Sequence, residues 1–590
     1  MPSKKSKKAA PLDGFFHYVE RGGSFSGEVA AGISMAALAV CGMFMNMQLV
    51  AQYLVTPYAD STMQQVAMNG EVYAMTWLAS MLAAFIGTLL IGLVARLPLV
   101  QVTSLSLSCV LASTISLNSG LTYYNMLAVV FVADVLYLVV AAVPAIRGFI
   151  EKGVPAPVRA ALPAAAGLLM AWIAAQLTGV FSVSSSVVPN YGTAANLGSS
   201  FAATSGVVPI SSYSYVTDMY HPQMLLSGLA AVLALVVYAI GARRAKSPFT
   251  KALVIGTIFF LVASILFCGI NWKNFKFGLS FLWARLWMVG SEDAMQAHVG
   301  AAISNLAIGK IFTEGFDFSG FTGNGGNVAT LFATGVLSYL FLFMGDADST
   351  LTSVPAVRPR RKVAANASAD AAAGNAGAAA SSAASVAASP SSSDSLAANP
   401  MLLNGVSNVV ALALGSAPLA LGKESVAGSR DGARSGLSAV VAAIVFLISG
   451  FVWVFPALLA TITSYTISFN MYGHYGYTMQ LLAQTSFSVA DAVMVAVGLL
   501  MAARSFGSVA PDLTKSTTSV PFMATVAVTL LTTNLAAGIA AGCVGSVLVR
   551  ATAPKRRKVQ RKVGFVERVG GVETLVCAAV SCVVLLLIAL

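Results

Sequence analysis

Residues 415–438 read GSAPLALGKESVAGSRDGARSGLS and separate two apolar runs, at 401–414 and 439–452. The stretch is rich in Gly, Ser and Ala, and it carries the carboxylate of Glu424. At membrane depth, a backbone can leave helical hydrogen bonding only where protein or a water-filled cavity receives its polar groups. The composition therefore favours a broken helix that lines a cavity, the place where transporters bind substrate. The spacing leaves one alternative open, a loop between two spans with Glu424 in water.

The whole chain has the composition of a membrane protein. Of its 590 residues, 57% are hydrophobic and 9% are charged, whereas soluble domains are about a quarter charged. A span needs roughly 20 apolar residues, and the sequence offers about a dozen or more such runs. We therefore expect an all-α polytopic membrane protein. Beside the broken segment, the expected spans are residues 29–53, 75–97, 100–117, 124–145, 157–177, 222–242, 251–270, 329–344, 401–414, 437–457, 489–503 and 520–550.

The net charge of +12 comes largely from short basic clusters between these runs. Such clusters mark cytoplasmic loops, so we expect no nucleic-acid partner. The basic segment 1–10 is followed by no cleavable signal sequence, which predicts a cytoplasmic N-terminus. The basic run 555–562 lies on the same side only if 520–550 crosses the membrane twice. That topology gives fourteen spans and leaves 572–590 as an additional apolar tail.

Two segments do not fit the pattern of spans. Residues 271–327 are aromatic and mixed in charge, which predicts an interfacial or external cap. Residues 364–399 are low-complexity Ala, Ser and Pro, and such a segment buries too little apolar surface to fold. The six cysteines and four histidines have no metal-ligand spacing, so we expect neither a metal site nor a cofactor.

Each half of the chain contains one polar segment of small residues, at 103–114 and at 415–435. Interrupted segments at corresponding positions of two halves indicate structural repeats with a binding site near the midplane. Seven spans in each half, an odd number, make the repeats inverted.

Four acids fall within or beside the predicted spans: Asp134, Asp346, Asp348 and Glu424. An ionised carboxylate at the centre of a span costs about 2.5 to 3.5 kcal/mol on insertion scales, so it normally faces a cavity or a partner. In a cavity, such a group can bind a proton together with a substrate that donates N–H hydrogen bonds. Asp346 and Asp348 can instead mark the cytoplasmic end of their span. Asp134 fits a structural hydrogen bond better than a substrate role.

Four stretches resemble the nucleobase–cation symporters of the xanthine/uracil permease clan, specifically the azaguanine-resistance branch of hypoxanthine, guanine and adenine permeases. The segment 424–436, ESVAGSRDGARSG, is similar to the signature of that family's tenth span and is the most specific of the four. The others are AGISMAALAVCGMFMN at 31–46, residues 120–167 with GLTYYNMLAVVF and AIRGFIEKGVPAPVRAALPAAAG, and FLFMGDADSTLTSVPAV at 341–357. The likeness covers most of the membrane part, but not the N-terminal tail or the Ala/Ser linker.

The resemblance implies fourteen spans as two inverted seven-span repeats, divided into a core and a gate domain. It also implies short strands in the broken third and tenth spans, and import of purine bases with protons. By position, Glu424 looks like the tenth-span substrate carboxylate and Asp348 like an eighth-span acid, and we expect both to bind substrate and couple protons. Asp346, Ser108 and Asn46 complete the expected substrate site.

The expected organisation follows from this likeness and from the apolar runs. A homodimer through the gate domain and a place in the plasma membrane are the expected assembly and location. The segments are a cytoplasmic tail at 1–26, core at 27–150, gate at 151–270, an aromatic segment at 271–328, core at 329–357, a linker at 358–400, core at 401–460, gate at 461–551, and a basic and apolar tail at 552–590.

Three positions depart from the family pattern and leave the substrate open. Gly345 stands where the family has a second acid, Ser108 where it has Asn, and Met47 where it has Pro. One alternative is an anion transporter of the related fold, with Lys423 and Arg434 supplying positive charge beside half-helix N-termini. Another is a transport-inactive scaffold or receptor. A membrane enzyme would need a nucleophile, histidine or metal cluster, and the sequence shows none.

Overall fold

The computed structural model describes residues 12–51, 62–117, 121–177, 236, 306–321, 328–354, 399–451, 466–471, 474–480, 489–552, 566 and 569–589. Within these ranges the chain is mainly helical. Six helices of this part are long and apolar enough to cross a membrane, with spans at Phe25–Met47, Met75–Ala95, Tyr123–Ala142, Ala156–Ala175, Val328–Leu351 and Leu535–Thr552. The prediction of a multi-pass helical membrane protein is confirmed.

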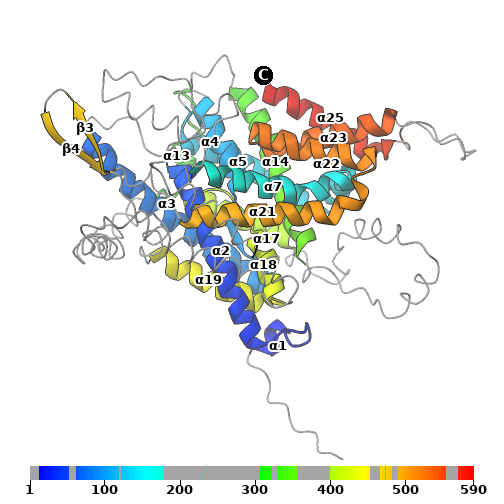
Figure 1. The fold of residues 1–590 in the computed structure, drawn as a ribbon, viewed down its shortest axis with the longest axis horizontal. Helices are drawn as coiled ribbons and strands as arrows, with labels where there is room; N and C mark the ends of the chain where they lie inside the picture. Colours follow the sequence, from blue (N-terminus) through cyan, green and yellow to red (C-terminus); the bar gives the residue numbers. More distant parts are fainter. Residues whose placement is uncertain are drawn as a thin grey trace, which may run out of the picture.

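Two sets of elements follow one another in the same order in the two halves of the chain (Figure 1). The first set is α2 (Phe25–Ala51), α3 (Thr62–Leu90) with the π-helical turn η1 (Ile91–Ala95), β1 (Gln101–Thr103), α4 (Leu105–Leu117) and α5 (Tyr123–Ala142). The second set is α14 (Val328–Ser353), α17 (Pro400–Ala413), β2 (Leu419–Leu421), α18 (Glu424–Asp431) and α19 (Gly436–Phe451).

Local sequence explains where several of these helices begin and end. Thr122 caps α5 in a capping box with Asn125, and α5 ends before Pro144, which opens the amphipathic helix α6 (Pro144–Gly153). Asn399 caps α17 through its side chain, and Pro400 occupies the first helical position.

The short strands expected in the two broken segments are present, and they pair with each other. β1 and β2 run antiparallel, with Gln101 opposite Leu421 and Thr103 opposite Leu419. All residues of both strands are buried. A buried backbone that leaves a helix must find other hydrogen-bond partners. Each strand supplies the partners that the other needs, so the two breaks in the helical structure meet at one place.

The contacts around the strands repeat with inverted symmetry. In β1, the first N–H, of Gln101, donates to Thr88 Oγ1 of α3 at 2.9 Å. In β2, the first N–H, of Leu419, donates to Asn408 Oδ1 of α17 at 2.8 Å. The helix packing shows the same correspondence. In one half of the arrangement α2 and α3 pack on α19, and in the other half their counterparts α14 and α17 pack on α5. The two sets of elements are therefore inverted copies of one arrangement.

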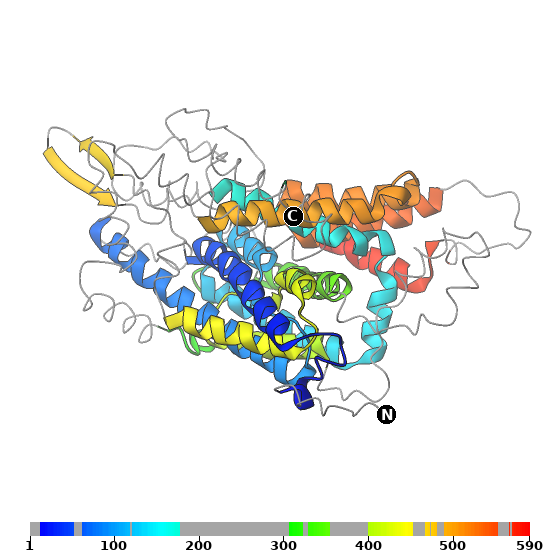
Figure 2. The ribbon, with the colours of Figure 1, turned by 60° about the horizontal axis from the view of Figure 1, so that its bottom comes forward.

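A second group of helices lies beside these repeats. It consists of α7 (Ala156–Leu177), α21 (Val489–Val509), α22 (Ser516–Thr532) and α23 (Leu535–Thr552), which pack on one another. We call them the gate helices, after the domain in which the resemblance places them. Figures 1 and 2 show α21, α22 and α23 together with α7, separate from α19 and α3. Gly167 of α7 crosses Gly498 of α21, where a Cβ on Gly167 would lie 2.7 Å from the Gly498 carbonyl oxygen.

Residues 520–550 form two helices, α22 and α23, and not one long helix, as the prediction of two crossings requires. Thr533 adopts a left-handed conformation between the two helices, which reverses the chain direction. The helix α25 (Val572–Ala589) packs against α23, α6 and α14, so the apolar tail is an integral part of the helix bundle. Two further strands, β3 (Thr466–Met471) and β4 (His474–Gln480), form a separate antiparallel hairpin.

One predicted boundary was wrong, and the error matters for the site. The sequence predicted a span at 329–344 followed by two acids, whereas α14 continues to Ser353. Asp346 and Asp348 therefore lie inside the helix and do not mark its end. Helix formation continues because residues 346–353 contain neither Pro nor Gly.

Several predictions fall outside the described residues. They are the spans at 222–242 and 251–270, most of the aromatic segment 271–328, the linker at 364–398 and the basic run 555–562. The division into domains and the count of fourteen spans therefore stay predictions.

Candidate functional site

The carboxylate of Asp346, on α14, lies against the start of α4. Ser104 Oγ donates to Asp346 Oδ2 at 2.7 Å, and Ser106 Oγ donates to the same oxygen at 3.1 Å. The N–H of Leu107, in the first turn of α4, donates weakly to Ser104 Oγ at 3.4 Å. The N-terminus of this broken helix therefore faces an acid from another helix, which its positive dipole end favours.

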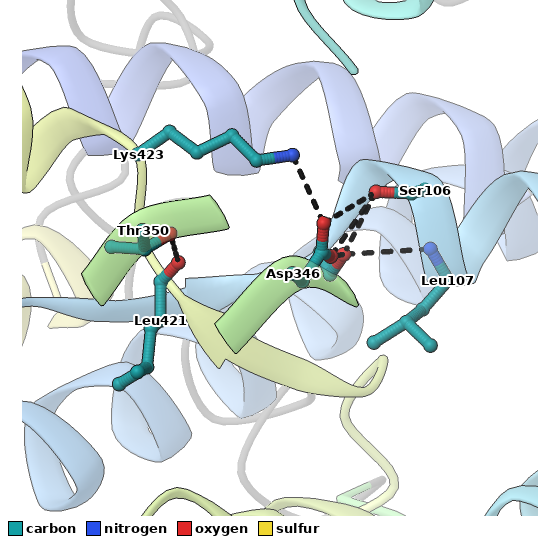
Figure 3. Close-up of polar contacts among 7 residues, drawn as sticks. Ser106, Leu107, Asp346, Thr350, Leu421 and Lys423 are labelled. Carbon is teal, nitrogen blue, oxygen red and sulfur yellow. Dashed lines mark hydrogen bonds and ion pairs between the residues drawn. The ribbon is translucent and has the colours of Figure 1, made fainter. Parts of the chain in front are cut away.

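Lys423 reaches the same carboxylate from the second broken segment. Its Nζ lies 3.0 Å from Asp346 Oδ1, and the side chains of Lys423 and Asp346 are 18% and 2% exposed (Figure 3). One turn further along α14, Thr350 Oγ1 donates to the carbonyl oxygen of Leu421 at 2.9 Å. α14 is thus tied to both β1–α4 and β2–α18 on one of its faces.

Glu424, the next residue, opens α18 and has a different environment. Its Oε2 is buried and has no hydrogen-bond partner in the described part of the chain. A Cβ on Gly42 of α2 would lie 3.4 Å from Glu424 Oε1 and 3.2 Å from Met494 Cε of α21. Glu424 therefore lies where a helix of the first repeat meets a gate helix, and glycine at position 42 leaves room beside its carboxylate.

Each of the two broken helices has a carboxylate at its N-terminus. Asp346 lies at the start of α4, and Glu424 is the first residue of α18. Lys423 neutralises Asp346. The site thus has two acids for one cation, and Glu424 is the acid without an ion pair among the described residues.

Asn46 and Ser108 lie within one helical turn of residues already placed at the site. Asn46 follows Gly42 by four residues on α2, and Ser108 follows Ser104 by four on α4, so each shares a face with the earlier residue. Both side chains are buried, and neither has a hydrogen-bond partner among the described residues. Their expected roles in substrate binding stay predictions.

Asp348 is not part of the cluster around Asp346. Residues two positions apart on an α-helix point to nearly opposite sides, so Asp346 and Asp348 lie on different faces of α14. Asp348 is three residues after Gly345, whose face approaches Ile539 of α23 and Leu162 of α7. The structure thus places Asp348 on the side of α14 that faces the gate helices, and its predicted proton-coupling role stays a prediction.

Sequence reasoning did not assign roles to Ser104 and Ser106, and it considered Lys423 only for an anion site. The signal for the serines was available in the alternating polar pattern SLSLS at 104–108. Lys423 could have been singled out because a buried cation in a membrane protein needs an acid as partner. The described residues contain no group of three or more His, Cys, Asp or Glu side chains that could hold a metal ion.

Solved structures include relatives of this chain. No protein-family model matches the sequence. Among solved structures, the chain is similar to the transmembrane domain of a cyanobacterium bicarbonate transporter, BicA. The two share 15% sequence identity with a TM-score of 0.44, over 88% of this chain and 96% of that one. A similarity of this size carries no argument about substrate.

Proposed function

We propose that this chain is a secondary active transporter that imports a purine nucleobase together with a proton by alternating access. The observation that carries the proposal is the carboxylate of Glu424, whose buried Oε2 has no hydrogen-bond partner among the described residues. A buried acceptor without a donor favours a ligand that brings N–H groups, or a proton.

Purine bases offer the matching chemistry. They are flat and mostly apolar, and they present N–H donors beside ring nitrogen and carbonyl acceptors. Glu424 can accept from such donors, while the amide of Asn46 and the hydroxyl of Ser108 can each donate or accept. These three residues come from α18, α2 and α4, which the paired strands bring together.

The position of Glu424 also fits alternating access. The carboxylate belongs to a broken helix of the second repeat, and beside it Met494 of α21 approaches Gly42 of α2. Movement of the repeats against the gate helices would change the access to Glu424 without breaking the strand pair. A proton and a base that bind the same carboxylate would cross together.

One observation favours an anion as the alternative substrate. Lys423 is a cation beside two helix N-termini, and such N-termini attract anions. In the structure, however, this cation is paired with Asp346, and both N-termini already face carboxylates. An anion would have to displace Asp346 and approach Glu424, so the charge arrangement favours a neutral substrate.

The test is uptake of radiolabelled hypoxanthine, guanine and adenine, with uracil, bicarbonate and sulfate as comparisons, in cells that lack their own nucleobase carriers. We expect saturable purine uptake that increases at acidic pH and falls by more than about 100-fold in Glu424→Gln, a loss of roughly 3 kcal/mol. Glu314→Gln is the matched control, because Glu314 forms a surface pair with Lys310 and is 52% exposed.

Surface expression of each variant is measured in parallel. Transport of bicarbonate or sulfate without any base would replace the purine proposal by the anion alternative. A well-expressed chain that moves none of these compounds would contradict both.

A further inference from the structure

The ion pair between Lys423 and Asp346 is surrounded by hydrogen-bond donors and is largely closed to water. Asp346 receives Lys423 Nζ at 3.0 Å, Ser104 Oγ at 2.7 Å and Ser106 Oγ at 3.1 Å. Its side chain is 2% exposed, so these groups replace water around the carboxylate. Hydrogen bonds to a charged partner are stronger than those between neutral groups, and the bond from Ser104 has the short length typical of them.

We propose that Lys423 is an internal counter-ion, which occupies at Asp346 the place that a coupled cation would otherwise take. Asp346 then stays charged throughout the transport cycle, and proton movement is left to the other carboxylates of the site. The inference rests on the proposed function for its transport readout, but the ion pair itself is tested without transport.

The location of the pair explains why a permanent charge there is useful. Asp346 belongs to α14, and Lys423 lies between β2 and α18, with Ser104 and Ser106 at the start of α4. The pair therefore joins three elements around the substrate carboxylate Glu424. A carboxylate that released its partners whenever it took up a proton would loosen this junction in every cycle.

The ionisable groups that face the pair are few in the described part of the chain. Tyr137 of α5 interacts with the Asp346 charge, and Glu424 interacts with both Lys423 and Asp346. On α14 itself, Asp348 lies on the opposite face. Lys423 is the cation bonded to Asp346, so its removal leaves a buried acid without a counter-charge.

This arrangement predicts how substitutions of Lys423 and Asp346 change the number of protons transported with each base. In Lys423→Met, Asp346 has lost its cation and can bind a proton of its own, so the proton-to-base ratio increases by about one. In Lys423→Met/Asp346→Asn, the extra site is removed and the ratio returns to that of the wild type. Lys423→Arg keeps the positive charge and should keep the wild-type ratio.

The single variant Asp346→Asn removes the acid of the pair and keeps the cation. It leaves Lys423 as a largely buried cation that still interacts with Glu424, so Lys423 competes with the substrate for this carboxylate. Uptake should fall by more than about tenfold, and Lys423→Met should restore it in the double variant. If Asp346 carried the coupled proton, the double variant would instead lack proton coupling.

The experiment measures proton flux and radiolabelled base flux together in proteoliposomes that contain the purified full chain. The base is the one that the wild type transports best. An unchanged ratio in Lys423→Met, or a lower ratio in the double variant than in the wild type, would overturn the proposal.

A second readout separates this proposal from the function on which it rests. The melting temperature of the detergent-purified protein should fall in Lys423→Met and in Asp346→Asn, and recover in the double variant. This double-mutant cycle measures the pair even if no base is transported. Additive decreases in melting temperature would show that the two side chains act independently and would contradict the internal counter-ion.

Discussion

At the scale of single residues, the buried acids of this chain have distinct surroundings. Asp346 is surrounded by donors and a cation, whereas Glu424 has a buried oxygen without a partner. Asp134 on α5 is fully buried, and neither of its carboxylate oxygens has a hydrogen-bond partner among the described residues. Asn408 of α17 lies beside it. The surroundings of each carboxylate thus depend on which elements pack around it.

Asp134→Asn is expected to leave transport intact. The substitution keeps the shape of the side chain and removes a carboxylate that forms no ion pair within the described part of the chain. Uptake should stay within about twofold of the wild type, and the melting temperature should be unchanged or higher. If uptake by this variant no longer depended on pH, Asp134 would be a proton-coupling residue. Loss of uptake with normal expression would lead to the same conclusion.

At the scale of elements, two three-residue strands hold the broken helices in register. Each strand has its first N–H bonded to a side chain of a neighbouring helix, Thr88 for β1 and Asn408 for β2. Beyond the strands, Ser104 N–H donates to Pro418 O at 2.9 Å and Gly422 N–H to Val100 O at 2.8 Å. A segment so short depends on these side-chain bonds at its ends.

Asn408→Ala should destabilise the protein by about 1 to 3 kcal/mol, because it leaves the buried Leu419 N–H without an acceptor. Thr88→Val should have a similar effect on Gln101, since the two positions are equivalent in the inverted repeats. Ser407→Ala is the control: its hydroxyl bonds to Leu403 O within the same helix, and its loss should cost little. Melting temperatures that do not separate Asn408→Ala from Ser407→Ala would contradict this view.

At the scale of the whole molecule, the proposed alternating access requires that the repeats move against the gate helices. α2 meets α21 at Gly42 and Met494, close to Glu424. The α22–α23 hairpin lies within the gate group, where a Cβ on Gly545 would be 3.9 Å from the Cβ of Ala524. These two contacts allow a matched comparison, since one joins parts that the proposal sets in relative motion and the other joins two helices within the gate group.

Cross-linking should distinguish the two contacts. With Gly42→Cys and Met494→Cys together, a short bifunctional thiol reagent should stop the uptake that the double variant retains, whereas the same reagent should not change the uptake of either single variant. With Gly545→Cys and Ala524→Cys, a disulfide of ordinary Cβ spacing should form and leave uptake unchanged. Uptake that continues after complete α2–α21 cross-linking, checked by mass spectrometry, would contradict movement at this contact.

The sequence alone determined the class of the molecule and the place of its central irregularity. The lack of charge along the apolar runs defines a membrane protein, because a charged residue at the bilayer centre is costly. The small, polar segments 103–114 and 415–435 indicated broken helices, and both begin at or beside the paired strands. Hydropathy is a local property, so it could be read without knowing which elements meet.

Only the tertiary structure decided which acid pairs with which group. From the sequence, Asp348 was expected to bind substrate and couple protons, Asp346 only to bind substrate, and Lys423 was the neighbour of Glu424. The continued helix α14 turns Asp346 toward Ser104, Ser106 and Lys423 and places Asp348 on its other side. These contacts join positions up to 242 residues apart, and their geometry depends on helix phase and packing, which no local pattern in the chain encodes.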